Sequence, residues 1–117
     1  MTCLIACLGT GKGTWSEVRQ LIDSESWEKV FLITNSFGKE KFTDPKAEFI
    51  VVDDLQAPYA IAPVIISQLR GKILDTQVAL SMISGGGNVH MAVMSALLKL
   101  GFGIRLVNFS GGKAEEL

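Results

Sequence analysis

The stretch "ISGGGNVHMAVMSALLKLGFGIRLV" (residues 83–107) decides the fold of this chain. A run of apolar residues ends in Ser84 and three glycines, and a helical apolar pattern begins immediately afterwards. A second glycine-rich turn, "LGTGKGTW" (residues 8–15), follows the first apolar run of the chain. Each stretch has the form strand, tight turn, helix, which is the repeating unit of an α/β fold.

The same alternation continues along the whole sequence. Strands are typically short apolar runs and helices longer amphipathic ones, with proline near the start and glycine after the end. On these grounds we predict strands over 2–8, 29–36, 48–54, 77–83 and 103–109, and helices over 16–22, from Pro58 or Pro63 to Arg70, and over 89–100. Residues 38–47 are expected to be mostly loop with one helical turn, because Pro45 prevents a longer helix.

These elements predict a single Rossmann-like domain over residues 1–117, a three-layer sandwich with a mostly parallel five-stranded sheet. The predicted strands are apolar on both faces, as in parallel sheets covered by helices on each side. Right-handed crossovers favour the strand order 3-2-1-4-5, in which the first and fourth strands are neighbours. Ligands of such sheets bind at the carboxyl ends of the strands where the winding reverses. Both glycine-rich turns fall at that point.

Composition limits the classes of ligand and partner. The chain has 117 residues, 48% of them hydrophobic, and a formal net charge of −1 without any basic run. This argues against binding to long nucleic acid, which needs a phosphate-neutralising surface, but a small anion can be held by backbone amides and helix N-termini. No apolar segment approaches the roughly 20 residues that span a bilayer. We therefore expect a soluble cytoplasmic protein without a membrane partner.

The two cysteines are expected to be reduced thiols packed in the core. Cys3 and Cys7 lie in one predicted strand, where their Cα atoms would be roughly 13 Å apart, too far for a disulfide. Two cysteines and a single histidine also make a poor set of metal ligands. We expect no metal and no cofactor.

The first glycine turn, Gly9 to Thr14, matches neither common phosphate-binding motif. In a P-loop the lysine is followed by Ser or Thr, whereas Lys12 is followed by Gly13. In the dinucleotide motif a glycine would occupy the position of Thr14, and an acidic residue would follow the second strand, where Asn35 and Ser36 stand. A nicotinamide cofactor is therefore disfavoured. The turn either presents backbone N–H groups to a ligand or is only a tight connection with Thr14 or Ser16 as helix N-cap.

The second turn gives a more specific signal. Three consecutive glycines lose much backbone entropy on ordering, which a plain connection would not require. Ser84 and Asn88 place hydrogen-bonding side chains at its edges, and the positive end of the following helix points toward it. His90, the only histidine, lies just inside that helix. It either contacts a phosphate or base and assists proton transfer, or has no functional role.

The strand, Ser-Gly-Gly-Gly-Asn turn and small-residue helix of residues 81–107 resemble the late motif of CARF domains, the CRISPR-associated Rossmann fold. "LIACLGTGKGTW" (residues 4–15) resembles the first motif of that family, a strand followed by a turn rich in Gly, Ser and Thr. The resemblance implies a homodimer that binds cyclic oligoadenylate, a second messenger of type III CRISPR antiviral defence, across its two-fold axis. We expect a stand-alone form without a fused effector. The implied ligand-binding residues are Gly9, Thr10, Gly11, Gly13, Thr14, Trp15, Asn35, Ser36, Phe37, Ser84, Gly85, Gly86, Gly87, Asn88 and His90.

The resemblance also raises the possibility of a ring nuclease, which opens the cyclic ligand slowly and without metal. In that reaction the ligand's own 2′-hydroxyl attacks the adjacent phosphate, so the protein mainly orients the ribose and stabilises charge. The family often has a lysine where this chain has Asn88, which is uncharged. Lys12, His90 or Lys113 would have to compensate, and the candidate catalytic residues are therefore His90, Asn88 and Lys12. Trp15 and Phe37 either stack on adenines or pack against the fold.

Two alternatives remain open at this stage. The first alternative to a cyclic oligoadenylate protein is a non-catalytic module for another nucleotide or small anionic ligand. The second is an interaction protein in which the apolar helix over 89–100 forms a subunit interface.

Overall fold

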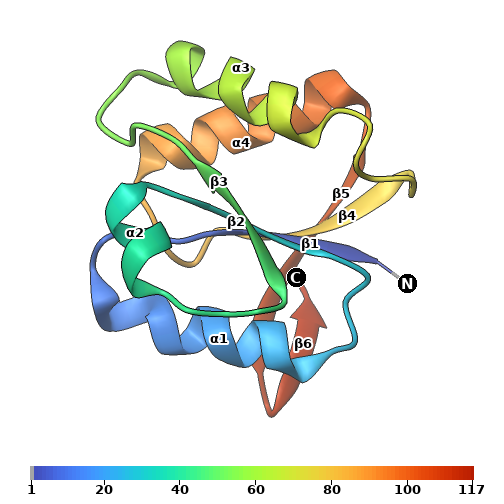
Figure 1. Cartoon of the computed structure of the whole chain (residues 1–117). Helices are drawn as coiled ribbons and strands as arrows, with labels where there is room; N and C mark the ends of the chain where they lie inside the picture. Colours follow the sequence, from blue (N-terminus) through green and yellow to red (C-terminus); the bar gives the residue numbers. More distant parts are fainter. Residues whose placement is uncertain (1) are drawn as a thin grey trace.

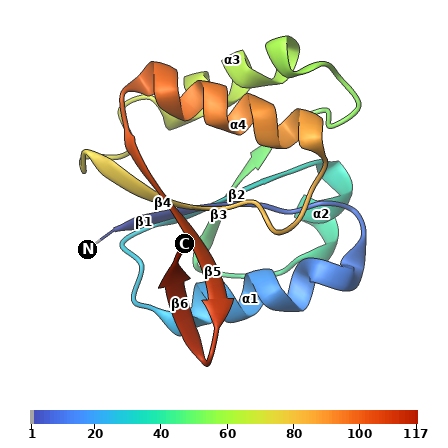
Figure 2. The ribbon, with the colours of Figure 1, turned by 180° about the vertical axis from the view of Figure 1, so that it is seen from behind.

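The computed structural model describes residues 2–117, except for the side chain of Lys12, and contains one sheet between two layers of helices (Figure 1). Helices α3 and α4 cover one face of the sheet, and α1 and α2 lie on the other (Figures 1 and 2). In chain order the elements are β1 (Cys3–Cys7), the 3-10 helix η1 (Lys12–Thr14), α1 (Trp15–Ser24), β2 (Val30–Thr34), α2 (Ser36–Lys41), β3 (Ala47–Val51), α3 (Pro58–Leu69), β4 (Gln77–Ser81), α4 (Gly87–Leu100), β5 (Gly103–Ser110) and β6 (Lys113–Glu116).

The strand order is β3-β2-β1-β4-β5-β6, so the predicted α/β class and the order of the first five strands are confirmed. Strands β1 to β5 run parallel, with Leu4 opposite Val30 on one side and Ala79 on the other. The winding reverses between β1 and β4, as predicted. The prediction of five strands was wrong by one, because residues 113–116 pair antiparallel with the end of β5.

Alternate residues of β1 supply the two cores of the sandwich. Cys3, Ile5 and Cys7 pack toward α3 and α4, whereas Leu4 and Ala6 pack toward α1. All five are buried. Because successive side chains of a strand point to opposite faces, only a strand that is apolar throughout can be buried on both sides.

The helix boundaries follow ordinary capping chemistry. Pro58 is the first residue of α3, so of the two prolines it is the one that starts the helix, and the helix continues through Pro63. Gly101 ends α4 in the left-handed conformation, with φ of +83°, as glycine after a helix commonly does. Helix α2 begins earlier than predicted, because the side chain of Asn35 accepts a hydrogen bond from the Gly38 amide and caps it.

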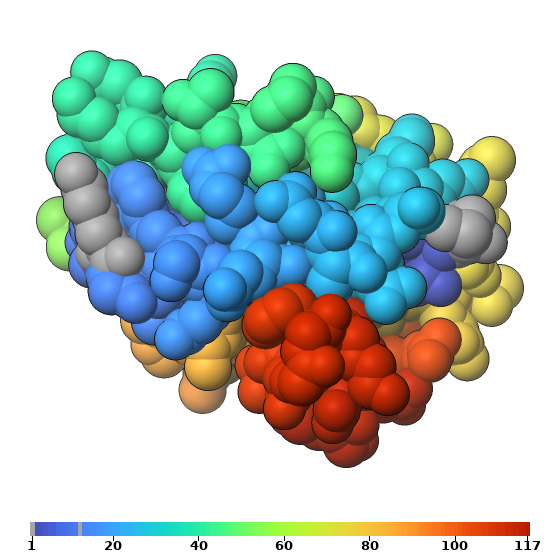
Figure 3. Space-filling view, turned by 90° about the horizontal axis from the view of Figure 1, so that it is seen from below, coloured from blue at the N-terminus to red at the C-terminus, as the bar shows by residue number. Residues whose placement is uncertain are grey.

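The β5–β6 hairpin lies beside α1 (Figure 3). Val107 and Ala114 of the hairpin join the core beneath α1. Across the hairpin, Nη2 of Arg105 lies 2.7 Å from Oε1 of Glu116. Within residues 2–117 there is no helix of sufficient length and apolarity to cross a bilayer.

Candidate functional site

The two glycine turns meet at the carboxyl end of the sheet. The Gly9 amide donates a hydrogen bond of 2.8 Å to the hydroxyl of Ser84, 75 residues further along the chain. A β-carbon on Gly9 would lie 2.9 Å from both the Cα and the amide nitrogen of Gly85. Because those neighbours are backbone atoms, only glycine permits this approach of the two turns.

His90 supports the second turn from inside α4. Its Nε2 lies 2.7 Å from the carbonyl oxygen of Ser84. A carbonyl oxygen only accepts, so Nε2 carries a hydrogen and donates it. The turn then continues through Gly85, whose φ of +98° is a conformation that other residues rarely adopt. This nitrogen of His90 therefore holds the shape of the turn.

Trp15 supports the first turn in a similar way. Its indole Nε1 donates a hydrogen bond of 2.7 Å to the carbonyl oxygen of Gly9. Its ring packs edge-on against Phe42, with centroids 5.7 Å apart, and at a tilt against Phe37, with centroids 6.2 Å apart. Arg19 lies over the Phe42 ring at 4.2 Å from its centroid. Trp15 thus anchors the turn to an aromatic cluster.

A pocket of about 550 Å³ opens between the two turns. Its lining combines backbone of the glycines with the hydroxyls of Thr10, Thr14 and Ser84. The lining residues are Gly9, Thr10, Gly11, Gly13, Thr14, Asp54, Ile83, Ser84, Gly85 and Gly86. Helix α4 begins at this pocket, and Gly86 at its N-cap has no side chain with which to cap it. The amide end of a helix of this length favours negative charge on a ligand.

Asp54 carries the only charge among the described side chains that line this pocket. Its Oδ2 accepts a hydrogen bond of 3.1 Å from Asn35, at the end of β2. Its main-chain oxygen accepts one of 2.7 Å from the side-chain amide of Asn88, which also donates to the Gln56 oxygen at 2.9 Å. Both N–H groups of Asn88 thus tie the second turn to the loop after β3.

A second hollow, of about 460 Å³, lies across Asp54 from the first. It is lined by Asn35, Ser36, Phe37, Val51, Val52, Asp53 and Asp54. A narrow hollow lined by Thr34, Asp54 and Gly86, among others, lies between the two. The Thr34 hydroxyl is buried and has no hydrogen-bond partner among the residues that the structure describes. Asp54 is the residue common to all three spaces.

The larger hollow at the opposite edge of the sheet is a weaker candidate. It measures about 680 Å³ and is lined by residues 22–30 and Lys46. Apart from Lys46, it is formed by a single connection between α1 and β2, and Lys46 pairs across it with Asp23 at 3.4 Å. It lies away from the carboxyl ends of the strands, whereas at the carboxyl edge three loops distant in sequence converge.

The structure separates the predicted site residues into three groups. The first group lines the pocket between the turns and consists of Gly9, Thr10, Gly11, Gly13, Thr14, Ser84, Gly85 and Gly86. The second group lines the second hollow and consists of Asn35, Ser36 and Phe37. The third group forms hydrogen bonds that hold the turns and consists of Trp15, Asn88 and His90. Gly87 is the first residue of α4 and lines neither hollow. The side chain of Lys12 lies outside the described residues, and Lys113 is at the start of β6, away from the pocket.

Asp54 and Ile83 line the pocket but were not predicted from the sequence. The signal for Asp54 was present, because it ends the "EFIVVDD" run at the same edge as the two turns. No group of three or more His, Cys, Asp or Glu side chains gathers as a metal site within the described part of the chain. No family model, curated protein or solved structure matches this chain.

Proposed function

We propose that this protein binds a cyclic oligoadenylate in the pocket between the two glycine turns and does so as a homodimer. The observation that carries the proposal is the convergence of these turns at the switch point, joined by the bond from the Gly9 amide to Ser84. It combines with the resemblance of both turns to the ligand-binding motifs of CARF domains.

The lining suits a phosphodiester with adjoining sugar. Backbone N–H groups of glycine turns and the uncapped end of α4 stabilise the single negative charge of a phosphodiester. Thr10 and Thr14, which line the pocket, add hydroxyl groups that can donate to and accept from a ribose. The volume of about 550 Å³ is within the usual range of small-molecule sites. A ring of several nucleotides is larger than such a site, so one ring would lie over two pockets, one from each chain of the homodimer.

The outer face of α4 supports the dimeric part of the proposal. Met91 and Leu98, two turns apart on this helix, are 65% and 64% exposed. The neighbouring helix α3 has no charged residue over its full length. Ile83, which precedes the second turn and is 46% exposed, also lines the pocket. Burying this apolar surface in a second copy would bring two pockets close together.

Ring opening is the less supported part of the function. It would proceed by attack of the ligand's 2′-hydroxyl on the adjacent phosphorus, with the 5′-oxygen leaving and a 2′,3′-cyclic phosphate formed. The Nε2 of His90 and both N–H groups of Asn88 are already engaged in holding the turns. Turnover would then depend on the backbone amides that stabilise the developing charge, without a free side-chain base from these two residues, and we expect it to be slow.

The test is calorimetric titration with cyclic tetra-adenylate and cyclic hexa-adenylate, with linear oligoadenylate as the control ligand. We expect one ring bound per two chains, and recovery of the ligand as intact or linear separates binding from cleavage. The matched variant is Gly11→Phe, because Gly11 lines the pocket and no atom lies within 4 Å of a β-carbon there, so the backbone has room for a side chain. It is expected to abolish binding while the thermal midpoint is retained.

Two results would contradict this proposal. Absence of heat with both rings for the wild-type protein would exclude cyclic oligoadenylate as the ligand. Equal binding by wild type and Gly11→Phe would place the ligand elsewhere on the surface. Binding of linear nucleotides in preference to rings would instead support a module for another nucleotide, the second function that this lining allows.

A further inference from the structure

We infer that Asp54 reads the base of the ligand: its carboxylate accepts a hydrogen bond from the exocyclic 6-amino group of an adenine. The pocket would then select aminopurines over oxopurines. This inference rests on the proposed function and adds a specificity-determining residue to it.

The position of Asp54 is fixed from both sides of the site. Asn35 holds its Oδ2 from the end of β2, and Asn88 holds its main-chain oxygen from the start of α4. Asn35 is itself fixed, since its Oδ1 caps α2 by accepting from Gly38. A carboxylate held in this way keeps its orientation when a ligand binds, which is what discrimination between similar groups requires.

The chemistry of the carboxylate determines which part of the ligand faces it. An ionised carboxylate accepts hydrogen bonds and cannot donate them, and it repels a phosphate oxygen. The phosphodiester therefore belongs at the glycine turns, and a hydrogen-bond donor belongs at Asp54. In an oligoadenylate the donors are the 6-amino group of the base and the 2′-hydroxyl of the ribose.

The hollow beyond Asp54 favours the base over the ribose. Its lining combines the exposed Phe37 and the half-buried Val51 with polar residues, and Phe37 offers an aromatic surface to a flat base. A base in this hollow would present its polar edge to Asp54 at the boundary with the first pocket. The ribose and phosphate would lie over the threonine hydroxyls and glycine amides.

The test compares three tetrameric rings in the same titration: the adenylate ring, the inosinate ring, and the ring of 2′-deoxyadenylate. Inosine replaces the 6-amino donor with an oxygen that would face the carboxylate. We expect the wild-type protein to bind the adenylate ring at least tenfold more tightly than the inosinate ring. In Asp54→Asn the ratio should fall to within about threefold of unity, because an amide both donates and accepts.

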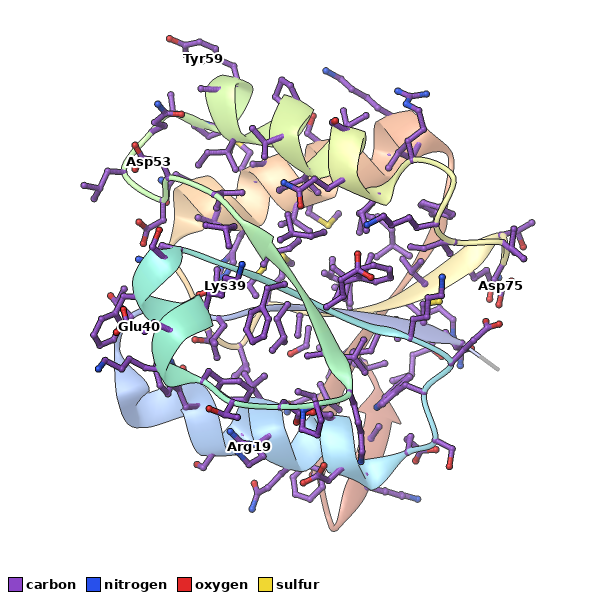
Figure 4. The ribbon with its side chains drawn as sticks, in the orientation of Figure 1. Arg19, Lys39, Glu40, Asp53, Tyr59 and Asp75 are labelled. Atoms are coloured by element: carbon purple, nitrogen blue, oxygen red, sulfur yellow. The ribbon has the colours of Figure 1, made fainter. Side chains whose placement is uncertain are left out.

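The matched control is Asp75→Asn. It removes the same charge at the opposite end of the sheet, far from the loop that carries Asp53 and Asp54 (Figure 4). Asp75 accepts hydrogen bonds from the amides of Thr76 and Gln77 in its own turn, and the wild-type ratio should persist in this variant.

The outcomes separate this inference from the proposed function. If the wild-type protein binds the adenylate ring and the inosinate ring equally, the inference alone is overturned, whether or not Asp54→Asn folds. A preference that survives in Asp54→Asn also overturns it. Loss of affinity for the 2′-deoxy ring, together with equal binding of the adenylate and inosinate rings, would reassign the carboxylate to the ribose. If no ring binds to the wild-type protein, the proposed function fails and this inference fails with it.

Discussion

At the scale of single residues, Cys7 is a group whose ionisation changes strongly on folding. It lies at the end of β1 beneath the second turn, and a β-carbon on Gly85 would be 3.5 Å from its own. Burial raises the pKa of the Cys7 thiol from its ordinary value of 9.0 to about 12. The buried environment disfavours the thiolate, so the folded state keeps the proton that the unfolded chain loses.

This shift predicts loss of stability in alkaline solution. Below pH 9 the thiol is protonated in both states and contributes no pH dependence; between pH 9 and 12 only the unfolded chain ionises, and stability falls with rising pH. Between pH 8 and pH 10 we expect a loss of about 1.4 kcal/mol from this group. Urea unfolding of wild type and Cys7→Ala at both values measures it.

Comparing how the free energy of unfolding changes with pH in wild type and in Cys7→Ala removes the contributions of other groups that titrate in the same range. Cys7→Ala will be less stable than wild type at pH 8, since it leaves space in the core, but its further loss at pH 10 should be smaller by about 1.4 kcal/mol. An identical loss in both proteins would mean that the Cys7 thiolate is tolerated in the folded state.

At the scale of elements, the two glycine turns behave as one unit because their backbones touch. In Gly9→Ala the new β-carbon would meet Gly85 backbone at 2.9 Å, so one turn must move away from the other. We expect the free energy of unfolding to fall by about 1–3 kcal/mol. Denaturant unfolding measures this change, and affinity for the ring should fall with it.

Gly11→Ala is the matched control within the same turn. It adds the same methyl group where nothing lies within 4 Å, so the stability should stay within about 0.5 kcal/mol of wild type. Equal stability of the two variants would show that the turns can separate without loss of unfolding free energy. They would then not form a rigid binding surface for a ligand.

The same scale shows how far the sequence predicts this molecule. Apolar runs, prolines and glycines were enough for the helices over 16–22 and 89–100 and for the parallel order, because each signal is local or follows from crossover handedness. Strand β6 was missed, since "KAEE" is polar and becomes a strand only by pairing with the end of β5. Helix α2 was underestimated for a related reason, because its start depends on the side-chain cap from Asn35.

The limits of prediction at the site have another physical origin. The glycine turns were found because their composition is unusual, and the switch-point rule placed them together. The roles of Asn88 and His90 were not predictable, because their hydrogen bonds to Gln56, Asp54 and Ser84 depend on how three loops fold over one another. Side chains that resemble ligand contacts in a sequence here hold the loops in place.

At the scale of the whole molecule, the distribution of charge distinguishes its two faces. Helices α1 and α2 expose charged side chains such as Arg19, Lys39 and Glu40 (Figure 4). On the other face α3 has no charged residue, and α4 exposes Met91 and Leu98, with Lys99 as an exposed basic residue of its last turn. An apolar stripe of this kind on one side of a small protein is typical of a subunit interface.

If the proposed dimer forms through this stripe, Leu98→Glu should convert it to a monomer. A glutamate at that position would have to be desolvated in the interface without a partner, which costs several kcal/mol. Sedimentation velocity across a concentration series measures the outcome. The control is Leu74→Glu, which places the same charge on a leucine that is 92% exposed in the loop before β4, and it should leave the mass unchanged.

The Leu98→Glu variant also tests whether the proposed dimer is needed to bind the ring. If one ring spans two pockets, Leu98→Glu should lose most of its affinity for the ring although no pocket residue has changed, because each monomer then holds only part of the ligand. High ring concentrations should restore the dimer, since a ligand that binds only the assembled form stabilises it by mass action. A monomeric Leu98→Glu protein with wild-type affinity would contradict the shared site and place a complete ligand site within one chain.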